Sequence, residues 1–192
     1  MRGDLGVGSG EVHDKARAVL DFWFDAVPAE KRFARDAALD RTIAVRFEED
    51  RKAVLAGGAA GWRGDAETLL AAVILLDQFS RNAHRGVAEA FAGDALAVAL
   101  TREAIDRGWD MAIAPVRRAF LYMPLMHAED REIQALSLAC FERLGDPENL
   151  RYAREHAAVM ARFGRFPSRN DALGRVSTPE EVGYLSQPGA GW

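Results

Sequence analysis

Cysteine is almost absent from this sequence, because Cys140 is the only one among 192 residues. A single thiol excludes an intramolecular disulfide, which agrees with a reducing compartment such as the cytoplasm. Cys140 lies within an apolar helical pattern, so we expect a buried and inert thiol rather than a nucleophile.

Long apolar runs are absent too. The longest, residues 69–76, is much shorter than the roughly 20 residues that a membrane-spanning helix needs. Residues 1–10 are rich in glycine and have no apolar centre, which argues against a signal peptide. We therefore expect a cytoplasmic protein without a membrane partner.

An excess of positive charge is also lacking. The net charge is −4, and only three of the 25 basic residues are lysines. Nucleic-acid binding needs clustered excess Lys and Arg, so no nucleic-acid partner is expected. The length and the 49% hydrophobic content are typical of one globular domain. We predict a single helical domain over residues 1–192, with a flexible segment at 1–12.

Strand signals are nearly missing, whereas helix signals recur. Asp14, Asp36 and Asp65 are each placed to cap a helix, and Gly57 follows an apolar helical pattern. The run Thr178-Pro-Glu-Glu181 has the pattern of a capping box before a short last helix. The sequence predicts an all-α fold of about eight or more helices, joined by short connections into antiparallel hairpins.

Motifs of known catalytic chemistry are missing as well. The sequence contains no Gly-x-Gly-x-x-Gly loop, no Walker pattern and no Gly-x-Ser-x-Gly elbow. The histidines do not follow a zinc-binding spacing, and no cysteine accompanies them. We therefore expect no metal and no cofactor.

Asp77 is the first polar residue of interest, because it follows a helix that is apolar on nearly every face. A buried carboxylate without a partner costs several kcal/mol, so we expect an ion pair with Arg81 or with an arginine near the C-terminus. Asp77 is either an acid in a functional site or one half of a structural ion pair.

His127, Glu129 and Asp130 form a second candidate. A histidine three residues from a carboxylate can serve as general acid or base. The alternative is that the two carboxylates only favour the first turn of the next helix.

Arginines gather in turns. The segment 162–175 combines arginines with glycine, proline and phenylalanine, and it echoes the Arg-Asn pair that follows the 69–76 helix. The echo is either a duplicated helical unit or chance. Guanidinium groups on rigid turns suit an anionic ligand, and they equally suit internal ion pairs. The candidate ligand-binding residues are Arg81, Asn82, Arg85, Arg165, Arg169, Asn170 and Arg175.

Several ordered motifs resemble a known family. They are Val19-Leu-Asp-Phe-Trp-Phe24, Leu75-Leu-Asp-Gln-Phe-Ser-Arg-Asn82, Phe91-Ala-Gly-Asp94, Tyr122-Met-Pro-Leu-Met-His-Ala-Glu-Asp130, Gln134, His156 and the stretch from Arg162 to Glu181. Together they resemble the bacterial family known as domain of unknown function 924, over residues 18–185. The resemblance implies helical hairpins stacked in a right-handed arrangement similar to tetratricopeptide repeats, and it implies no established activity. The family usually has histidine where Ser168 stands, so the resemblance implies no acid–base role there.

Three functional hypotheses follow. The favoured one is an interaction module that binds a protein or peptide, because repeat-like helical folds seldom imply catalysis. The alternative is a small-molecule enzyme, such as a hydrolase, whose anionic ligand is held by Arg81, Arg165 and Arg169. In the third, the polar residues are only an ion-paired core. An open concave surface lined with apolar and aromatic residues would favour the module.

Overall fold

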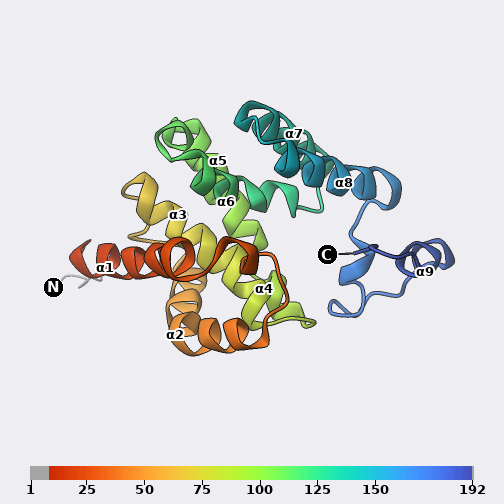
Figure 1. The fold of residues 1–192 in the computed structure, drawn as a ribbon, viewed down its shortest axis with the longest axis horizontal. Coiled ribbons are helices and arrows are strands. Elements are labelled where there is room, and N and C mark those ends of the chain that lie inside the picture. Colours follow the sequence, from red (N-terminus) through yellow and green to blue (C-terminus); the bar gives the residue numbers. More distant parts are fainter. Residues whose placement is uncertain (1–8, 192) are drawn as a thin grey trace, which may run out of the picture.

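The structure is a computed structural model that describes residues 9–191, and helices dominate it (Figure 1). Over these residues it contains no strand, so the predicted all-α class is confirmed. The α-helices are α1 (Ser9–Leu20), α2 (Ala37–Ala56), α3 (Ala66–Ile74), α4 (Ser80–Ala83), α5 (Asp94–Asp106), α6 (Pro115–Met126), α7 (Arg131–Leu144), α8 (Pro147–Phe163) and α9 (Pro179–Leu185).

Two π-helical turns and four 3₁₀ turns interrupt or join these helices. The π turns are η1 (Asp21–Ala26) and η3 (Leu75–Phe79). The 3₁₀ turns are η2 (Ala29–Lys31), η4 (Ala88–Phe91), η5 (Trp109–Ala112) and η6 (Pro167–Arg169).

Capping side chains set the beginnings of several helices. Asp36 and Asp65 accept hydrogen bonds from backbone N–H groups at the starts of α2 and α3, as the sequence predicts. Thr178 and Glu181 form the predicted capping box of α9. The first helix differs from its prediction, because α1 begins at Ser9 and Asp14 lies inside it. Of the segment expected to be flexible, residues 9–12 are helical and residues 1–8 lie outside the described part.

The two π turns meet in the centre of the core. Phe22 of η1 lies 5.9 Å from Phe79 of η3, and Phe47 of α2 lies 5.0 and 4.9 Å from these two rings. A π turn carries an extra residue, which rotates the side chains that follow it relative to a regular α-helix. In η3 this rotation affects Asp77 and Gln78, which are both buried.

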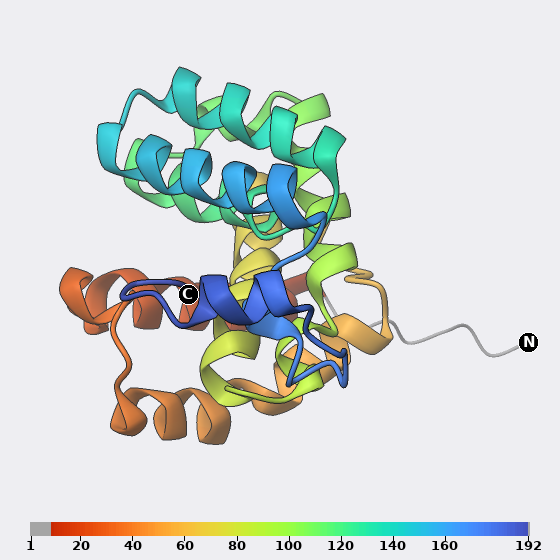
Figure 2. The same cartoon turned by 90° about the vertical axis from the view of Figure 1, so that its right-hand side faces the viewer.

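α3 lies at the middle of the molecule, and all of its residues from Thr68 to Ile74 are buried. α1, α5 and α6 pack against it, while α2 packs against η3 and α4. Helices α5 to α8 each contact the next one along the chain, and Figure 2 shows α7 and α8 lying side by side. This neighbour-to-neighbour packing fits stacked hairpins; the right-handed sense of the stack stays a prediction.

The chain after α8 forms a separate lobe that ends in α9 (Figures 1 and 2). A small apolar cluster joins the lobe to α8. In it Phe166 packs against Val159 and Met160 of α8, with Phe163 and Tyr184 at the edge. Because this apolar contact is small, the position of the lobe also depends on polar contacts with the body. Within residues 9–191, no helix is both long and apolar enough to cross a membrane.

Candidate functional site

A buried carboxylate lies at the centre of the candidate site. The side chain of Asp77 is 1% exposed and contacts three polar groups. Its Oδ1 lies 2.9 Å from a terminal nitrogen of Arg81 and 2.8 Å from Nδ1 of His127. Its Oδ2 accepts a 2.6 Å hydrogen bond from the amide of Gln78. The expected ion pair between Asp77 and Arg81 is therefore present.

A second carboxylate, Asp94, joins the two Arg-Asn segments. Its Oδ2 accepts hydrogen bonds of 3.0 Å from both Arg81 and Arg169. Arg169 also donates to the backbone oxygen of His127 at 2.7 Å, and its guanidinium lies 4.6 Å from the centre of the Phe91 ring. We call Asp77, Arg81, Asp94, His127 and Arg169 the charged cluster.

Asp94 reaches this position because Gly93 allows a close approach of α5 to η3. A Cβ atom at Gly93 would lie 2.8 Å from the backbone oxygen of Leu76, which is well inside van der Waals contact. The absence of a side chain at Gly93 therefore places the first residue of α5 beside the charged cluster.

The charged cluster has balanced charge. Burial by itself would raise the pKa of Asp77, but the charge of Arg81 and the hydrogen bond from His127 outweigh burial and hold the pKa below its usual range. Burial lowers the pKa of Arg169 to about 10, which keeps the guanidinium protonated near pH 7. Burial also lowers the pKa of His127, despite the attraction of Asp77. Two carboxylates thus balance two guanidinium groups, and His127 is neutral.

The bond to Asp77 fixes the tautomer of His127. An ionised carboxylate only accepts hydrogen bonds, so Nδ1 of His127 carries the proton and donates it to Asp77. Nε2 of the neutral ring then has a lone pair and no proton. Among residues 9–191 nothing donates to Nε2, and the side chain is 16% exposed. His127 therefore presents a hydrogen-bond acceptor.

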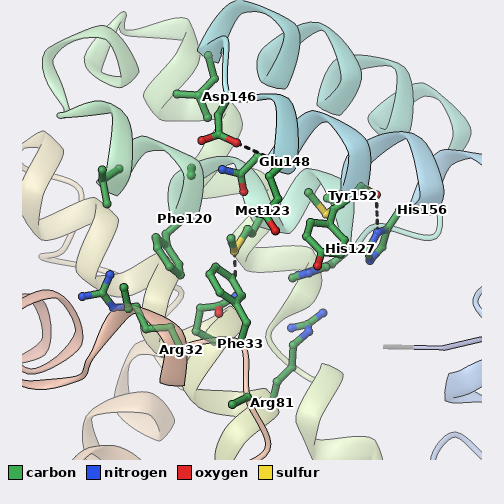
Figure 3. A pocket seen from close by; sticks show the side chains of 18 of the residues that line it. Arg32, Phe33, Arg81, Phe120, Met123, His127, Asp146, Glu148, Tyr152 and His156 are labelled. Carbon is green, nitrogen blue, oxygen red and sulfur yellow. Dashed lines mark hydrogen bonds between the residues drawn. The ribbon is translucent and has the colours of Figure 1, made fainter. Parts of the chain in front are cut away.

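A cleft of about 640 Å³ opens beside the charged cluster, and His127 and Arg81 are among its lining residues (Figure 3). The lining comes from residues 29–34, residues 78–85, α6, residues 144–146 and α8 as far as His156. Apolar side chains that line it include Phe33, Val116, Phe120, Met123, Met126 and Tyr152. Residues 116, 120, 123 and 127 follow helical spacing, so one face of α6 supplies the apolar wall, and its C-cap residue His127 supplies the acceptor.

His156 lies next to His127 at the edge of the cleft, with ring centres 5.7 Å apart. Its Nδ1 hydrogen-bonds the backbone oxygen of Tyr152 at 2.8 Å. Burial is the main cause that lowers the pKa of His156 to about 3. The ring is therefore uncharged at neutral pH.

Asn82 and Arg85 also line the cleft, but their polar groups are turned to α2. Both donate to the carboxylate of Asp40, Asn82 at 2.7 Å and Arg85 at 2.6 and 3.0 Å. Their contacts join α4 to α2, and their role in ligand binding stays a prediction.

Arg165, Asn170 and Arg175 lie in the C-terminal lobe and do not line the cleft. Arg165 forms two hydrogen bonds with Glu181, which also accepts one from Asn170. Arg175 forms two hydrogen bonds with Glu129. These pairs hold the lobe together and against the body. The structure therefore brings Arg81 and Arg169 together, but not Arg165.

Glu129 and Asp130 do not act on His127. Asp130 caps α7 by accepting hydrogen bonds from two backbone N–H groups, as one of the two readings of this segment anticipates. Glu129 accepts from the backbone N–H of Phe166 as well as from Arg175. The expected reach from His127 to Asp130 along one helical turn is wrong, because α6 ends at Met126 and the partner of His127 is Asp77.

Sequence reasoning missed Asp94 and the apolar wall of the cleft. Asp94 entered the sequence analysis only within the motif Phe91-Ala-Gly-Asp94, although an acidic residue there also fits an arginine partner. Phe120 and Met123 precede His127 by seven and four residues. That spacing was the available signal that apolar groups and the histidine share one face of a helix.

Cys140 is buried as expected, and burial raises the pKa of its thiol. No group of three or more potential metal ligands occurs in the described part of the chain.

Comparison with known proteins places the chain in a family. It matches no curated protein. A solved structure of a protein of unknown function from Agrobacterium tumefaciens is 41% identical, covers 91% of this chain and 98% of its own, and superposes with a TM-score of 0.86. The family model described as "Bacterial protein of unknown function (DUF924)" matches residues 19–189. Because that model spans most of the sequence, the chain belongs to the DUF924 family.

Proposed function

We propose that the protein is an interaction module whose cleft binds an apolar segment of a partner polypeptide. The observation that carries this proposal is a group of outward-facing apolar side chains that line the cleft. Phe33 is 68% exposed and Val116 is 66% exposed. Large apolar side chains that gather in water mark surfaces that a partner covers.

A polypeptide fits this cleft better than a compact metabolite does. The volume of about 640 Å³ would hold a small molecule. Such a ligand, enclosed within the cleft, would leave the outer faces of Phe33 and Val116 in water. A chain segment lying across the mouth buries them. It also inserts one side chain between Phe120 and Met123, in the manner of an interface anchor.

The charges at the two ends of the cleft suit a polypeptide with charges of both signs. Arg32 donates to the backbone oxygens of residues 23, 24 and 27, and forms no ion pair with any described carboxylate. Asp146 and Glu148 lie across the cleft, at the start of α8 (Figure 3). A partner segment with an acidic residue toward Arg32 and a basic residue toward Glu148 complements this arrangement.

An anionic ligand held by Arg81, Arg165 and Arg169 has less support. Arg81 and Arg169 already share the carboxylate of Asp94, so an anion would compete with an existing partner. Arg165 is bound to Glu181 at a distance from the cleft lining. The reducing cytoplasm is the proposed location, and the buried single thiol of Cys140 is compatible with it.

Selection from a phage-displayed library of random 12-residue peptides tests the proposal. We expect peptides selected on the wild type to lose binding to Val116→Arg, because the substitution places a charge at the mouth of the cleft. Val45→Arg is the matched control, since Val45 of α2 is 86% exposed and does not line the cleft. Failure to enrich any peptide, or equal binding to both variants, would contradict the proposal.

A further inference from the structure

We infer that the side chain inserted into the cleft carries a hydrogen-bond donor at its tip, and that tyrosine is the residue that fits. This inference rests on the proposed function and specifies the partner's anchor residue. It starts from Nε2 of His127, a polar atom of the charged cluster that accepts no hydrogen bond from residues 9–191.

The polar groups near His127 offer acceptors and no uncompensated charge. The amide nitrogen of Gln78 is directed to Asp77 and to the sulfur of Met123, at 2.6 and 3.4 Å. Its oxygen, the other end of the amide, has no hydrogen-bond partner among residues 9–191. The guanidinium of Arg81 is occupied by Asp77 and Asp94. A neutral donor therefore satisfies this end of the cleft better than an anion does.

The walls select an aromatic body for that donor. The ring of Phe33 stacks on Phe120, with centres 5.7 Å apart and planes inclined by 12°. The sulfur of Met123 lies between Phe120 and His127 along α6, and thioethers make favourable contacts with aromatic rings. Along the cleft the apolar wall comes first and the acceptor follows it. A tyrosine side chain matches this order, because its ring is apolar and its tip carries a hydroxyl group.

A cationic tip is disfavoured at the same place. Arg81 and Arg169 both oppose positive charge at His127, since each lowers the pKa of that residue. An ammonium group would meet the same repulsion. Serine has a donor but no ring to cover Phe33, which is 68% exposed. Among the common side chains, tyrosine combines the neutral donor, the apolar body and the length.

Two features indicate that the pair of Asp77 and His127 serves more than packing. Asp77 belongs to the π turn η3, and such turns occur often at functional sites. Buried ionic groups are also weak stabilisers compared with apolar residues of similar volume. A functional role for Asp77 explains both features. Asp77 accepts the proton of Nδ1 in a hydrogen bond and so holds His127 in the tautomer whose Nε2 is an acceptor.

Binding of two model compounds to the wild-type protein tests the inference without knowledge of the partner. N-acetyl-tyrosinamide and N-acetyl-phenylalaninamide differ by one hydroxyl group. We expect the tyrosine compound to bind about three- to tenfold more tightly, the usual contribution of one hydrogen bond. The measurement is an NMR titration that follows the methyl group of Met123.

The variant His127→Phe removes the acceptor and should abolish the preference for tyrosine. The matched control is His13→Phe, because His13 is an exposed histidine on α1 that does not line the cleft. Should His127→Phe fail to fold, ¹⁵N NMR of the wild-type imidazole gives an independent reading: we expect a protonated Nδ1 and an unprotonated Nε2.

The outcomes separate this inference from the proposed function. Equal affinity for the two compounds in the wild type, or a proton on Nε2 near pH 7, would overturn the inference and leave the cleft as a binding site. Binding of neither compound would contradict the cleft itself, and the inference would fall with it.

Discussion

Acidification should destabilise the protein through His156. Its side chain is 5% exposed, and burial lowers its pKa from 6.5 to about 3 in the folded state. Below pH 6.5 the unfolded chain binds a proton at this residue that the folded chain does not bind. The contribution of neutral His156 is therefore fully present above pH 6.5 and is lost as the pH falls toward 3.

The size of the destabilisation at pH 5 follows from the difference between pH 5 and the pKa of 6.5 in the unfolded chain. That difference is about 1.5 units, and each unit is worth about 1.4 kcal/mol. The contribution of His156 to the free energy of unfolding should therefore fall by about 2 kcal/mol between pH 7.5 and pH 5. A folded pKa of 4 instead of 3 would leave this figure almost unchanged, because both values lie well below pH 5.

Urea denaturation followed by circular dichroism at pH 7.5 and pH 5 measures this change. His156→Asn keeps a donor near the backbone oxygen of Tyr152 but does not titrate in this range. Above pH 7 the free energies of unfolding of the variant and the wild type should differ by a constant amount. At pH 5 the wild type should lose about 2 kcal/mol more than the variant relative to that difference. A difference independent of pH would refute the buried neutral histidine.

Four further substitutions test other parts of the structure. Gly93→Ala should lower the free energy of unfolding by about 1–3 kcal/mol in urea denaturation, because the new Cβ would clash with the backbone oxygen of Leu76. Gly183→Ala in α9 is the control. Its new Cβ has no atom within 4 Å, so it should raise the local stability of the helix by about 0.5–1 kcal/mol. Thr178→Ala removes a helix cap, so it should lower the stability of α9 by about 1 kcal/mol and accelerate hydrogen exchange in α9 only. Slower or unchanged exchange in α9 would contradict this prediction. Asp77→Asn should lower the free energy of unfolding by about 3–5 kcal/mol in urea denaturation, because Arg81 then loses a buried partner. A decrease of less than about 1 kcal/mol would contradict a buried ion pair between Asp77 and Arg81.

Helix beginnings were predictable because capping is a local interaction. Asp36, Asp65 and Thr178 each bond to backbone groups within three residues of themselves, so a short stretch of sequence contains both partners. Asp14 was misleading for the same reason. An acidic residue in the interior of α1 has the same appearance in the sequence as a cap, and only the start of the helix at Ser9 distinguishes them.

The π turns were not predictable from the same rules. Apolar spacing shows that residues 69–79 are helical and buried, but one extra residue in a turn leaves that pattern nearly intact. What fixes η3 is its contact with the aromatic rings of η1 and α2. Those rings, Phe22 and Phe47, precede Phe79 by 57 and 32 residues, so their influence is a tertiary effect.

The sequence predicts that the arginines form ion pairs, but it does not predict which carboxylate pairs with which arginine. Each candidate needed an acid or an anion, and the sequence offered more carboxylates than arginines. Arg165 and Arg175 found their partners in the C-terminal lobe and in the 129–130 connection. Arg81 and Arg169 met at Asp94, which depends on the close approach at Gly93 and is not visible in any local pattern.

The meeting at Asp94 makes the chemistry of the cleft depend on the C-terminal lobe. Arg169 belongs to η6, whereas Asp77 and Arg81 belong to the body. If the lobe separated from the body, Arg169 would leave, and Asp77 and Asp94 would together exceed the charge of Arg81. The surplus negative charge beside His127 would raise the pKa of that residue. A protonated Nε2 is a donor and no longer accepts a hydroxyl group. Docking of the lobe through Arg169 therefore helps to keep His127 neutral, and with it the preference of the cleft for a donor.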